Sequence, residues 1–193
     1  MIIGVTGKAR SGKDTFAGFL AEELFRATKS RYILMAYATE LKQRVQRDFD
    51  LSFEQLWGSE KEVKDPRYQK EDGELWTARE ILQAYGQFYR TIDGDFWVRA
   101  LFDTIEEKKY KNIIITDVRH PNEADPIKEL GGKVLRVTSS RSDIPNIHGQ
   151  NHISETAMDD YNCDYTVVNN WGLNELRGSA REAVALILNK GDN

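Results

Sequence analysis

The sequence predicts an α/β protein in which a parallel five-stranded sheet is flanked by layers of helices. Strand-like runs alternate with helical patterns, and residues 113–117 are apolar enough for a strand buried on both faces. The first strand leads through a glycine-rich loop directly into a helical pattern. Strands are expected at residues 1–6, 32–36, 113–117, 133–138 and 165–168. Helices are expected from Phe16 onward and near residues 77–92, 95–109, 122–130 and 173–189.

Length and composition favour one domain spanning residues 1–193. The chain can enclose a hydrophobic core, because 40% of its residues are hydrophobic and 30% are charged. No apolar run is long enough to cross a bilayer and no signal peptide precedes the first strand, so a cytoplasmic protein without a membrane partner is expected. Cys163 is the only cysteine, which excludes an internal disulfide and fits a reducing compartment. The net charge of -4 argues against polymeric nucleic acid as a partner.

The loop after the first strand has the complete spacing G-x-x-x-x-G-K. Glycines allow backbone N–H groups to surround phosphate oxygens, and the helix that follows offers its positive N-terminal end. The lysine of this motif bridges the β- and γ-phosphates. The sequence therefore predicts that ATP is bound by the loop residues Gly7, Lys8, Ala9, Arg10, Ser11, Gly12, Lys13, Asp14 and Thr15.

The position after the loop lysine departs from the usual motif. Asp14 stands where Ser or Thr is common, and a hydroxyl group follows one residue later at Thr15. We expect Thr15 to lie near the phosphates and Mg²⁺. Asp14 is either a carboxylate stabilised by the helix dipole or a contact to metal-bound water, and both alternatives remain open at this point.

An acidic residue ends the apolar run 113–117. Asp117 is expected at the carboxyl end of a buried strand, where ligands of open α/β sheets bind, and it resembles the aspartate that orients Mg²⁺ in phosphate-loop enzymes. Arg119 follows two residues later, and on an extended segment both side chains point the same way. An ordinary ion pair at a strand end is the alternative. Together with the glycine loop, the pattern favours a metal-ordering acid and a phosphate-binding cation.

The predicted helix at 77–92 has two different faces. Apolar side chains at helical spacing are expected in the core: Ile81, Leu82, Tyr85, Phe88 and Tyr89. The opposite face carries Arg79, Gln83, Gly86 and Arg90 within an arc of about 60°. Guanidinium groups bind phosphate, an amide can recognise a base edge, and a glycine leaves space for a ligand. This stripe predicts a binding site for a nucleoside monophosphate, with a solvated helix face as the alternative.

Three further segments are expected to contribute to phosphoryl transfer. Residues 37–110 are predicted to be an acceptor-binding insertion, in which Trp97 either lines the acceptor pocket or lies in the core. The charged stretch 58–75 predicts a mobile flap. The polar stretch 139–156 follows a strand and predicts a lid, from which Arg141 would stabilise charge and exclude water. Arg10 and Arg136 are weaker candidates for phosphate contacts.

Two histidines in the predicted lid resemble a metal site. His148 and His152 are four residues apart, and Glu155 follows three residues later. Gly149 weakens any helix there, so polar lid contacts explain these residues better than a metal does.

These residues together resemble the bacteriophage deoxynucleoside monophosphate kinases, which are P-loop nucleoside monophosphate kinases. The likeness spans most of the chain, and its marks are the segments 7–15, 79–86, 95–98, 117–119, 152–155 and 167–170. The resemblance implies the three-layer P-loop NTPase fold with lid and monophosphate-binding insertions, ATP as donor, Mg²⁺, deoxynucleotide acceptors and often a homodimer. It also implies that Asn169 or Asn170 lies near the adenine ring.

The predicted activity is transfer of the γ-phosphoryl group of ATP to a deoxynucleoside monophosphate. The catalytic residues are expected to be Lys13, Arg119, Arg141 and Asp117, with Thr15 and Asp117 near the metal. Another small P-loop kinase, acting on phosphomevalonate or dephospho-coenzyme A, would share the loop and the arginines. An ATP-dependent switch protein is the alternative outside the kinases.

Overall fold

The computed structural model describes residues 1–140 and 156–188. The chain divides into two compact units, of which the first contains residues 1–36 and 104–193 and the second contains residues 37–103. The second unit shares most of its range with the insertion expected at 37–110. That the whole chain acts as one kinase domain stays a prediction.

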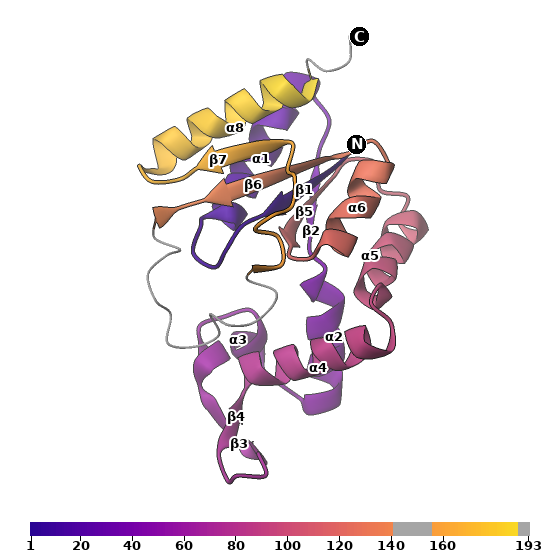
Figure 1. The fold of residues 1–193 in the computed structure, drawn as a ribbon, viewed down its shortest axis with the longest axis vertical. Coiled ribbons are helices and arrows are strands. Elements are labelled where there is room, and N and C mark those ends of the chain that lie inside the picture. Colours follow the sequence, from indigo (N-terminus) through magenta and orange to yellow (C-terminus); the bar gives the residue numbers. More distant parts are fainter. Residues whose placement is uncertain (141–155, 189–193) are drawn as a thin grey trace. The chain divides into compact units, whose positions relative to one another are not determined.

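Five parallel strands form the sheet of the first unit. They are β1 (Ile2–Thr6), β2 (Ile33–Met35), β5 (Ile113–Val118), β6 (Lys133–Thr138) and β7 (Tyr165–Val168). Their order is β2-β5-β1-β6-β7, so β1 lies in the centre and pairs with β5 and β6 (Figure 1). The predicted parallel five-stranded sheet is confirmed. Because all strands run the same way, their carboxyl ends meet at one edge, where ligands of such sheets bind.

Helices cover both faces of this sheet: α1 (Lys13–Thr28) and α8 (Leu173–Leu188) on one face, and α6 (Pro121–Glu129) on the other (Figure 1). The first face buries Phe16 of α1 against aliphatic side chains such as Val5 of β1. On the second face, Ile127 of α6 fits over Gly4, where an added Cβ would lie 2.8 Å from the Ile127 Cδ1 atom. The predicted three-layer α/β fold is therefore confirmed, and it fixes the end of β1 against the start of α1.

The second unit contains most of the remaining elements. They are α2 (Ala38–Phe49), α3 (Phe53–Leu56), the 3-10 turn η1 (Glu60–Glu62), β3 (Lys64–Gln69), β4 (Leu75–Thr77), α4 (Ala78–Ile92) and α5 (Phe96–Glu107), whose last turn belongs to the first unit. Thr77 caps α4: its hydroxyl accepts from the backbone N–H of Glu80 at 3.2 Å, and the Glu80 carboxylate accepts from the N–H of Thr77 at 2.8 Å. This reciprocal cap explains why the helix begins at Ala78.

The sequence predicts a flap at residues 58–75, and this range contains the 3-10 turn η1 followed by a β-hairpin that extends to Thr77. The antiparallel strands β3 and β4 pair Gln69 with Leu75, and the turn between them is closed by hydrogen bonds from the N–H of Lys70 to the Glu74 carbonyl at 2.7 Å and from the N–H of Gly73 to the Lys70 carbonyl at 3.0 Å. Gly73 has a φ of 88°, which a glycine adopts without strain. The segment therefore has regular secondary structure, which backbone pairing and not an apolar pattern defines, and its mobility stays a prediction.

A buried carboxylate joins the hairpin to α3. Asp65 is only 3% exposed, and its oxygens accept from Arg67 Nε at 2.9 Å, from Arg67 Nη2 at 2.7 Å and from Gln55 Nε2 at 2.8 Å. The hydrogen-bonded Arg67 guanidinium holds the pKa of the Asp65 carboxyl well below its usual range and outweighs the opposite effect of burial. The ionised carboxylate is therefore part of the folded unit.

Replacing Asp65 with asparagine is expected to lower the free energy of unfolding by about 2 kcal/mol, because charge-assisted hydrogen bonds are lost in a buried position. Since the folded-state pKa is depressed, the stabilisation is complete above about pH 5 and is lost as the pH falls below about 4. Urea denaturation of the wild type and of Asp65→Asn across this range measures both effects. Asp50→Asn is the control: its exposed carboxylate lies 3.7 Å from Arg67 Nη1, and the change should cost less than about 0.5 kcal/mol. A stability difference between wild type and Asp65→Asn that does not vary with pH would contradict the ionised pair.

Within the described residues, none of the helices combines the length and the apolar character that crossing a membrane requires.

Candidate functional site

The glycine-rich loop connects the end of β1 at Thr6 to the start of α1 at Lys13. At Gly7 the neighbouring atoms leave no room for a side chain, because an added Cβ would lie 2.4 Å from the Val137 carbonyl oxygen and 2.6 Å from Ser11 Oγ. Contacts under about 3 Å between such atoms are strongly repulsive. A glycine is therefore required where the loop leaves the sheet.

The other end of the loop is tied to the segment after β7. Gly12 has a φ of 87°, and an added Cβ there would lie 2.3 Å from Asn169 Nδ2. Asn169 Nδ2 donates to the Ser11 carbonyl at 2.9 Å, and the Asn169 N–H donates to the Thr138 carbonyl at 2.7 Å. Asn169 thus connects the loop, through its side chain, to the end of β6, through its backbone.

The side chains of the loop differ in exposure in a way that suits an anionic ligand. Ser11 is fully buried, and its Oγ has no hydrogen-bond partner among the described residues. Lys13 is 9% exposed, and its Nζ lies 3.9 Å from Asp14 Oδ2. Asp14 and Thr15 are exposed at the N-terminal turn of α1. A buried ammonium, a helix N-terminus and a glycine cradle are the groups that bind phosphates.

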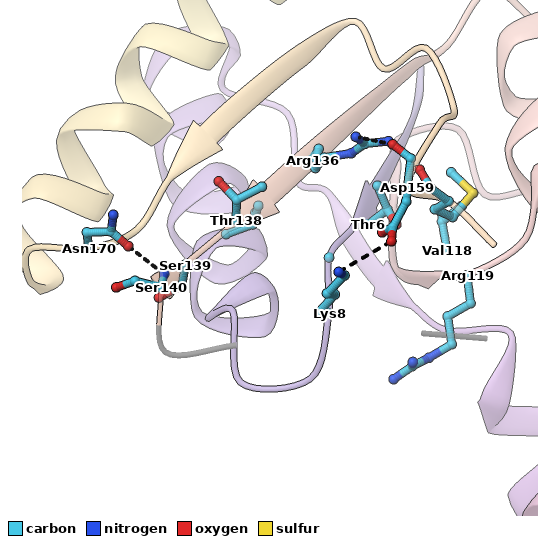
Figure 2. Close-up of a pocket in the computed structure, with 13 residues that line it drawn as sticks. Thr6, Lys8, Val118, Arg119, Arg136, Thr138, Ser139, Ser140, Asp159 and Asn170 are labelled. Carbon is cyan, nitrogen blue, oxygen red and sulfur yellow. Dashed lines mark hydrogen bonds and ion pairs between the residues drawn. The ribbon is translucent and has the colours of Figure 1, made fainter. Parts of the chain in front are cut away.

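A cavity of about 420 Å³ opens beside the loop at the carboxyl edge of the sheet. It is lined by Thr6, Gly7, Lys8, Val118, Arg119, Arg136, Val137, Thr138, Ser139, Ser140, Met158, Asp159 and Asn170 (Figure 2). Three of these residues are cationic and one is acidic, so the lining carries a positive charge. Hydroxyl and amide groups supply additional hydrogen-bonding partners. Such a cavity is suited to a small polyanion.

Three of the charged lining residues are engaged with each other or with the backbone. Lys8 Nζ lies 3.3 Å from Asp159 Oδ2, and Figure 2 shows this ion pair beside the loop. The Arg136 guanidinium donates to the carbonyl of Asp159 at 2.9 Å, to that of Tyr161 at 2.8 Å and to that of Met158. Arg136 therefore anchors residues 158–161, and its guanidinium is hydrogen-bonded to backbone carbonyls.

Asp117 and Arg119 occupy different places at the end of β5. Arg119 lines the cavity and extends from the strand end in Figure 2, while its backbone N–H donates to Glu123 Oε2 at 2.7 Å. Asp117 is half-buried inside β5, which continues to Val118. The two residues predicted to face one cleft are thus brought to one strand end, and Arg119 is the one that borders the cavity.

In the second unit, Arg79 lies in the first turn of α4 and forms an ion pair with Glu62 of η1. A cation at a helix N-terminus opposes the helix dipole, so this position gains from a nearby anion. Gln83 and Arg90 are half-buried on the same helix. The predicted stripe therefore exists in part.

Two residues of the predicted acceptor site are corrected. Gly86 does not leave a gap, because a Cβ there would lie 3.3 Å from both Leu41 Cδ2 and Arg90 Nη1, and α2 packs against this point. Trp97 is 2% exposed, and its Nε1 donates to the Gly86 carbonyl at 3.2 Å, so it belongs to the core and is not a pocket wall. Phe88, which the helical spacing predicts on the core face, is 61% exposed. The helical period gives the angular positions of the side chains around α4, but it does not show which side of α4 the neighbouring helix α2 covers.

The predicted lid at 139–156, with Arg141, His148, His152 and Glu155, lies almost entirely outside the described residues. Within the described residues, no group of three or more His, Cys, Asp or Glu side chains is arranged to hold a metal ion.

Ser139 and Ser140 are the first two residues of the predicted lid 139–156, and they line the cavity directly after β6, where ligands of parallel sheets bind. The sequence places this segment at the site but does not single out the two serines. Sequence reasoning missed Asp159, which carries no local signal, because it reaches the cavity through the contacts that Arg136 makes with its backbone.

A parallel sheet, a lysine-bearing glycine cradle and a cationic cavity at the same edge define a P-loop phosphotransferase that acts on nucleotides. The family model described as deoxynucleotide monophosphate kinase matches residues 31–179. The chain belongs to this deoxynucleotide monophosphate kinase family, and ATP is the phosphoryl donor that membership implies.

Two viral proteins are similar to this chain, and the name of one of them agrees with the family. A protein of Acanthamoeba polyphaga mimivirus, provisionally named a deoxynucleotide monophosphate kinase, is 28% identical in an alignment 193 residues long that covers 91% of this chain and 91% of that protein. An uncharacterised protein, ORF77, of Ictalurid herpesvirus 1 is 34% identical over 86 residues, which cover 43% of this chain and 37% of that protein.

Among solved structures, shikimate kinase from Aquifex aeolicus is 16% identical with a TM-score of 0.47 over 100% of both chains. A sugar kinase from Janibacter is 15% identical with a TM-score of 0.43, over 98% of this chain and 95% of its own. At these identities neither likeness bears on the substrate.

Proposed function

We propose that the protein transfers the γ-phosphoryl group of ATP to a deoxynucleoside monophosphate and releases a deoxynucleoside diphosphate and ADP. The observation that carries the proposal is the glycine cradle with its buried Lys13, which opens beside a cation-lined cavity at one edge of the sheet. Membership of the deoxynucleotide monophosphate kinase family supports the choice of acceptor.

The donor is proposed to lie along the loop from Gly7 to Thr15. Ser11 Oγ, which has no hydrogen-bond partner within residues 1–140 and 156–188, and the required glycines fit a triphosphate whose oxygens meet backbone N–H groups. Lys13 would neutralise the β- and γ-phosphates. Mg²⁺ would be held near Thr15 and Asp117, largely through phosphate oxygens and water, which agrees with the small number of protein ligands this ion needs. When bound, the ion supplies charge neutralisation for the transferring group.

The acceptor is proposed to use Arg79, Gln83 and Arg90 of α4 for its phosphate and base. Arg119, which borders the cavity, is proposed to hold the transferring phosphoryl group, and Arg141 of the predicted lid is proposed to assist it. An oxygen of the acceptor phosphate forms a bond to the γ-phosphorus, and the bond from the γ-phosphorus to the β–γ bridging oxygen breaks, so ADP leaves with the electron pair. Because the acceptor phosphate has a second pKa of about 6, it arrives as an anion and needs no general base.

A small-molecule acceptor and a homodimer, which the family resemblance implies, and a cytoplasmic location, which the composition predicts, complete the proposal. Analytical ultracentrifugation of the purified chain measures the oligomeric state directly. A monomer at all concentrations tested would remove the homodimer from the proposal and leave the reaction untouched.

The test of the reaction is coupled ADP release with a panel of acceptors: deoxynucleoside monophosphates, ribonucleoside monophosphates, phosphomevalonate and dephospho-coenzyme A. Stimulation by one or more deoxynucleoside monophosphates supports the proposal. Stimulation by phosphomevalonate or dephospho-coenzyme A alone would assign the chain to another kinase activity. ADP release that no acceptor changes would indicate a nucleotide-dependent switch protein.

Replacing Arg79 with alanine is expected to raise the KM for the acceptor by about tenfold, because a phosphate loses a charge-assisted contact, while the KM for ATP stays within about twofold. Arg47→Ala is a matched control, since Arg47 is an exposed arginine of the same unit paired with the exposed Asp48. The same coupled assay measures both constants. Unchanged acceptor KM together with unchanged kcat in Arg79→Ala would refute its role.

A further inference from the structure

Among the described residues that line the cavity beside the loop, one is acidic and three are cationic. The acid is Asp159, and the cations are Lys8, Arg119 and Arg136. A carboxylate repels the phosphate groups for which the rest of the lining is suited. Figure 2 shows the Asp159 carboxylate beside the Lys8 ammonium. The effect of Asp159 on a bound anion therefore depends on this pair.

The backbone turn that carries Asp159 is fixed to the first unit by several contacts. The N–H of Asp159 donates to the Thr156 carbonyl at 2.9 Å. As described above, the guanidinium of Arg136 in β6 donates to three carbonyls of this turn. The Tyr161 hydroxyl donates to Asp125 Oδ1 of α6 at 2.8 Å. The position of the turn therefore rests on contacts other than the ion pair with Lys8.

Lys8 and Asp159 form an ion pair that can exchange partners. Lys8 Nζ lies 3.3 Å from Asp159 Oδ2, and the two side chains are 42% and 47% exposed. An ion pair as exposed as this one adds little to the stability of a fold. The backbone of Lys8 is held separately, because its carbonyl accepts from the N–H of Ser11 at 3.2 Å. Only the lysine side chain therefore has to move when a second anion enters the cavity.

A carboxylate and a phosphate are alternative partners for the Lys8 ammonium. Both accept charge-assisted hydrogen bonds, and an ammonium group has several N–H donors. A phosphate that reaches Lys8 either replaces Asp159 or shares the ammonium with it. In both cases the negative charge of Asp159 stays close to the ligand. Repulsion then lowers the affinity, and it does so more strongly for a ligand that carries more charges.

We propose that Asp159 is an internal counter-anion of Lys8 that competes with the phosphates of a bound nucleotide and weakens their attachment. In many enzymes the release of product limits turnover, and tighter binding of substrate and product alike does not raise kcat. A competing carboxylate at the loop shortens the time for which the product ADP stays bound. This inference rests on the proposed kinase function, because ADP is a product of that reaction.

The experiment measures the Kd for ADP and for ATP by isothermal titration calorimetry of the full-length protein, with and without Mg²⁺ and without acceptor. Asp159→Asn is expected to lower the Kd for ADP by about fivefold, and the Kd for ATP by more, because a like charge is removed from the cavity lining. Asp159→Glu keeps the charge and should stay within about twofold of wild type. Asp160→Asn is the matched control, since Asp160 is exposed and is not among the described residues that line the cavity. It removes the same charge one residue away and should leave both Kd values within about twofold.

The two partners of the ion pair are expected to have opposite effects. Lys8→Met removes the ammonium and should raise the Kd for ADP by about fivefold, whereas Asp159→Asn lowers it. If the pair only stabilised the fold, loss of either partner would weaken nucleotide binding. In the coupled assay, Asp159→Asn should lower the KM for ATP while kcat does not rise, because ADP is held more tightly.

The binding results are independent of the reaction, because no acceptor is present. An unchanged Kd for ADP in Asp159→Asn would overturn the proposal. A raised Kd would also overturn it and would assign the carboxylate to positioning Lys8, or to Mg²⁺ if the rise occurs only with the metal. Equal changes in Asp159→Asn and Asp160→Asn would overturn it as well, because the net charge of the protein would then explain the effect. The expected Kd changes without transfer to any acceptor would support the counter-anion and contradict the kinase function.

Discussion

Replacing Lys13 with alanine is expected to lower kcat by about a thousandfold or more. The free energy of unfolding is expected to change little. Lys13 is the first residue of α1, is 9% exposed and follows the glycine that ends the loop. At this position its ammonium reaches the β- and γ-phosphates and neutralises charge that develops as the phosphoryl group moves. In a site of low solvent content, losing one such group costs about two to three orders of magnitude in rate or more.

Two further variants separate charge from geometry at this position. Lys13→Arg keeps the charge but replaces a compact ammonium with a planar fork, so it should recover only part of the lost rate. Lys108→Ala removes an exposed lysine at the end of α5, where Nζ lies 3.8 Å from Glu107, and should leave kcat unchanged. The coupled ADP-release assay with saturating ATP and acceptor provides the comparison. Normal turnover in Lys13→Ala would remove this residue from the mechanism.

The strands of the sheet could be predicted because their apolar runs reflect burial directly. β5 is the clearest example, since Ile113, Ile114 and Ile115 are all fully buried. Parallel strands covered on both faces need such runs, and few other elements of this size have them. The central layer of the fold therefore follows from local sequence.

The elements of the second unit are harder to predict because their sequences show weaker hydrophobic periodicity than the strands of the sheet do. α2 contains Leu41, Val45 and Phe49 at intervals of four residues, a helical period that was available but is diluted by charged neighbours. In β3 the one buried side chain is Asp65, so the pattern of inward and outward residues contains no apolar alternation. In β3 the buried position is occupied by a charged residue of an ion pair, whereas the usual alternation places an apolar residue there.

In the candidate site, too, residues within a local sequence motif could be predicted, and residues brought together by tertiary packing could not. The loop from Gly7 to Lys13 could be found because its chemistry is encoded in consecutive residues. Gly86 was placed beside a ligand because a helical wheel gives angles but not neighbours, and the structure puts Leu41 there. Asp159 could not be found because it meets Lys8 across more than a hundred residues of chain. Contacts that depend on tertiary packing leave no mark in a short stretch of sequence.

Replacing Gly7 with alanine is expected to lower the free energy of unfolding by about 2–3 kcal/mol and to abolish measurable ATP binding. The added Cβ would lie 2.4 Å from the Val137 carbonyl oxygen, and that oxygen belongs to the backbone of β6 and cannot turn away as a side chain would. The loop or the strand must shift to relieve the contact, which costs energy in the folded state and displaces the backbone N–H groups of the cradle. Thermal unfolding and isothermal titration calorimetry with ATP measure the two effects.

Gly18→Ala in α1 separates the steric effect from a general effect of removing a glycine. A Cβ at Gly18 would meet no described atom outside its own helix within 4 Å, and alanine favours a helix more than glycine does, so this change should stabilise the protein by about 0.5–1 kcal/mol. The two substitutions add the same methyl group on either side of the loop lysine and are expected to have opposite signs. If Gly7→Ala bound ATP with wild-type affinity, the cradle would have to tolerate a shift of its first residue, and the close approach of the loop to β6 would not be what shapes the phosphate site.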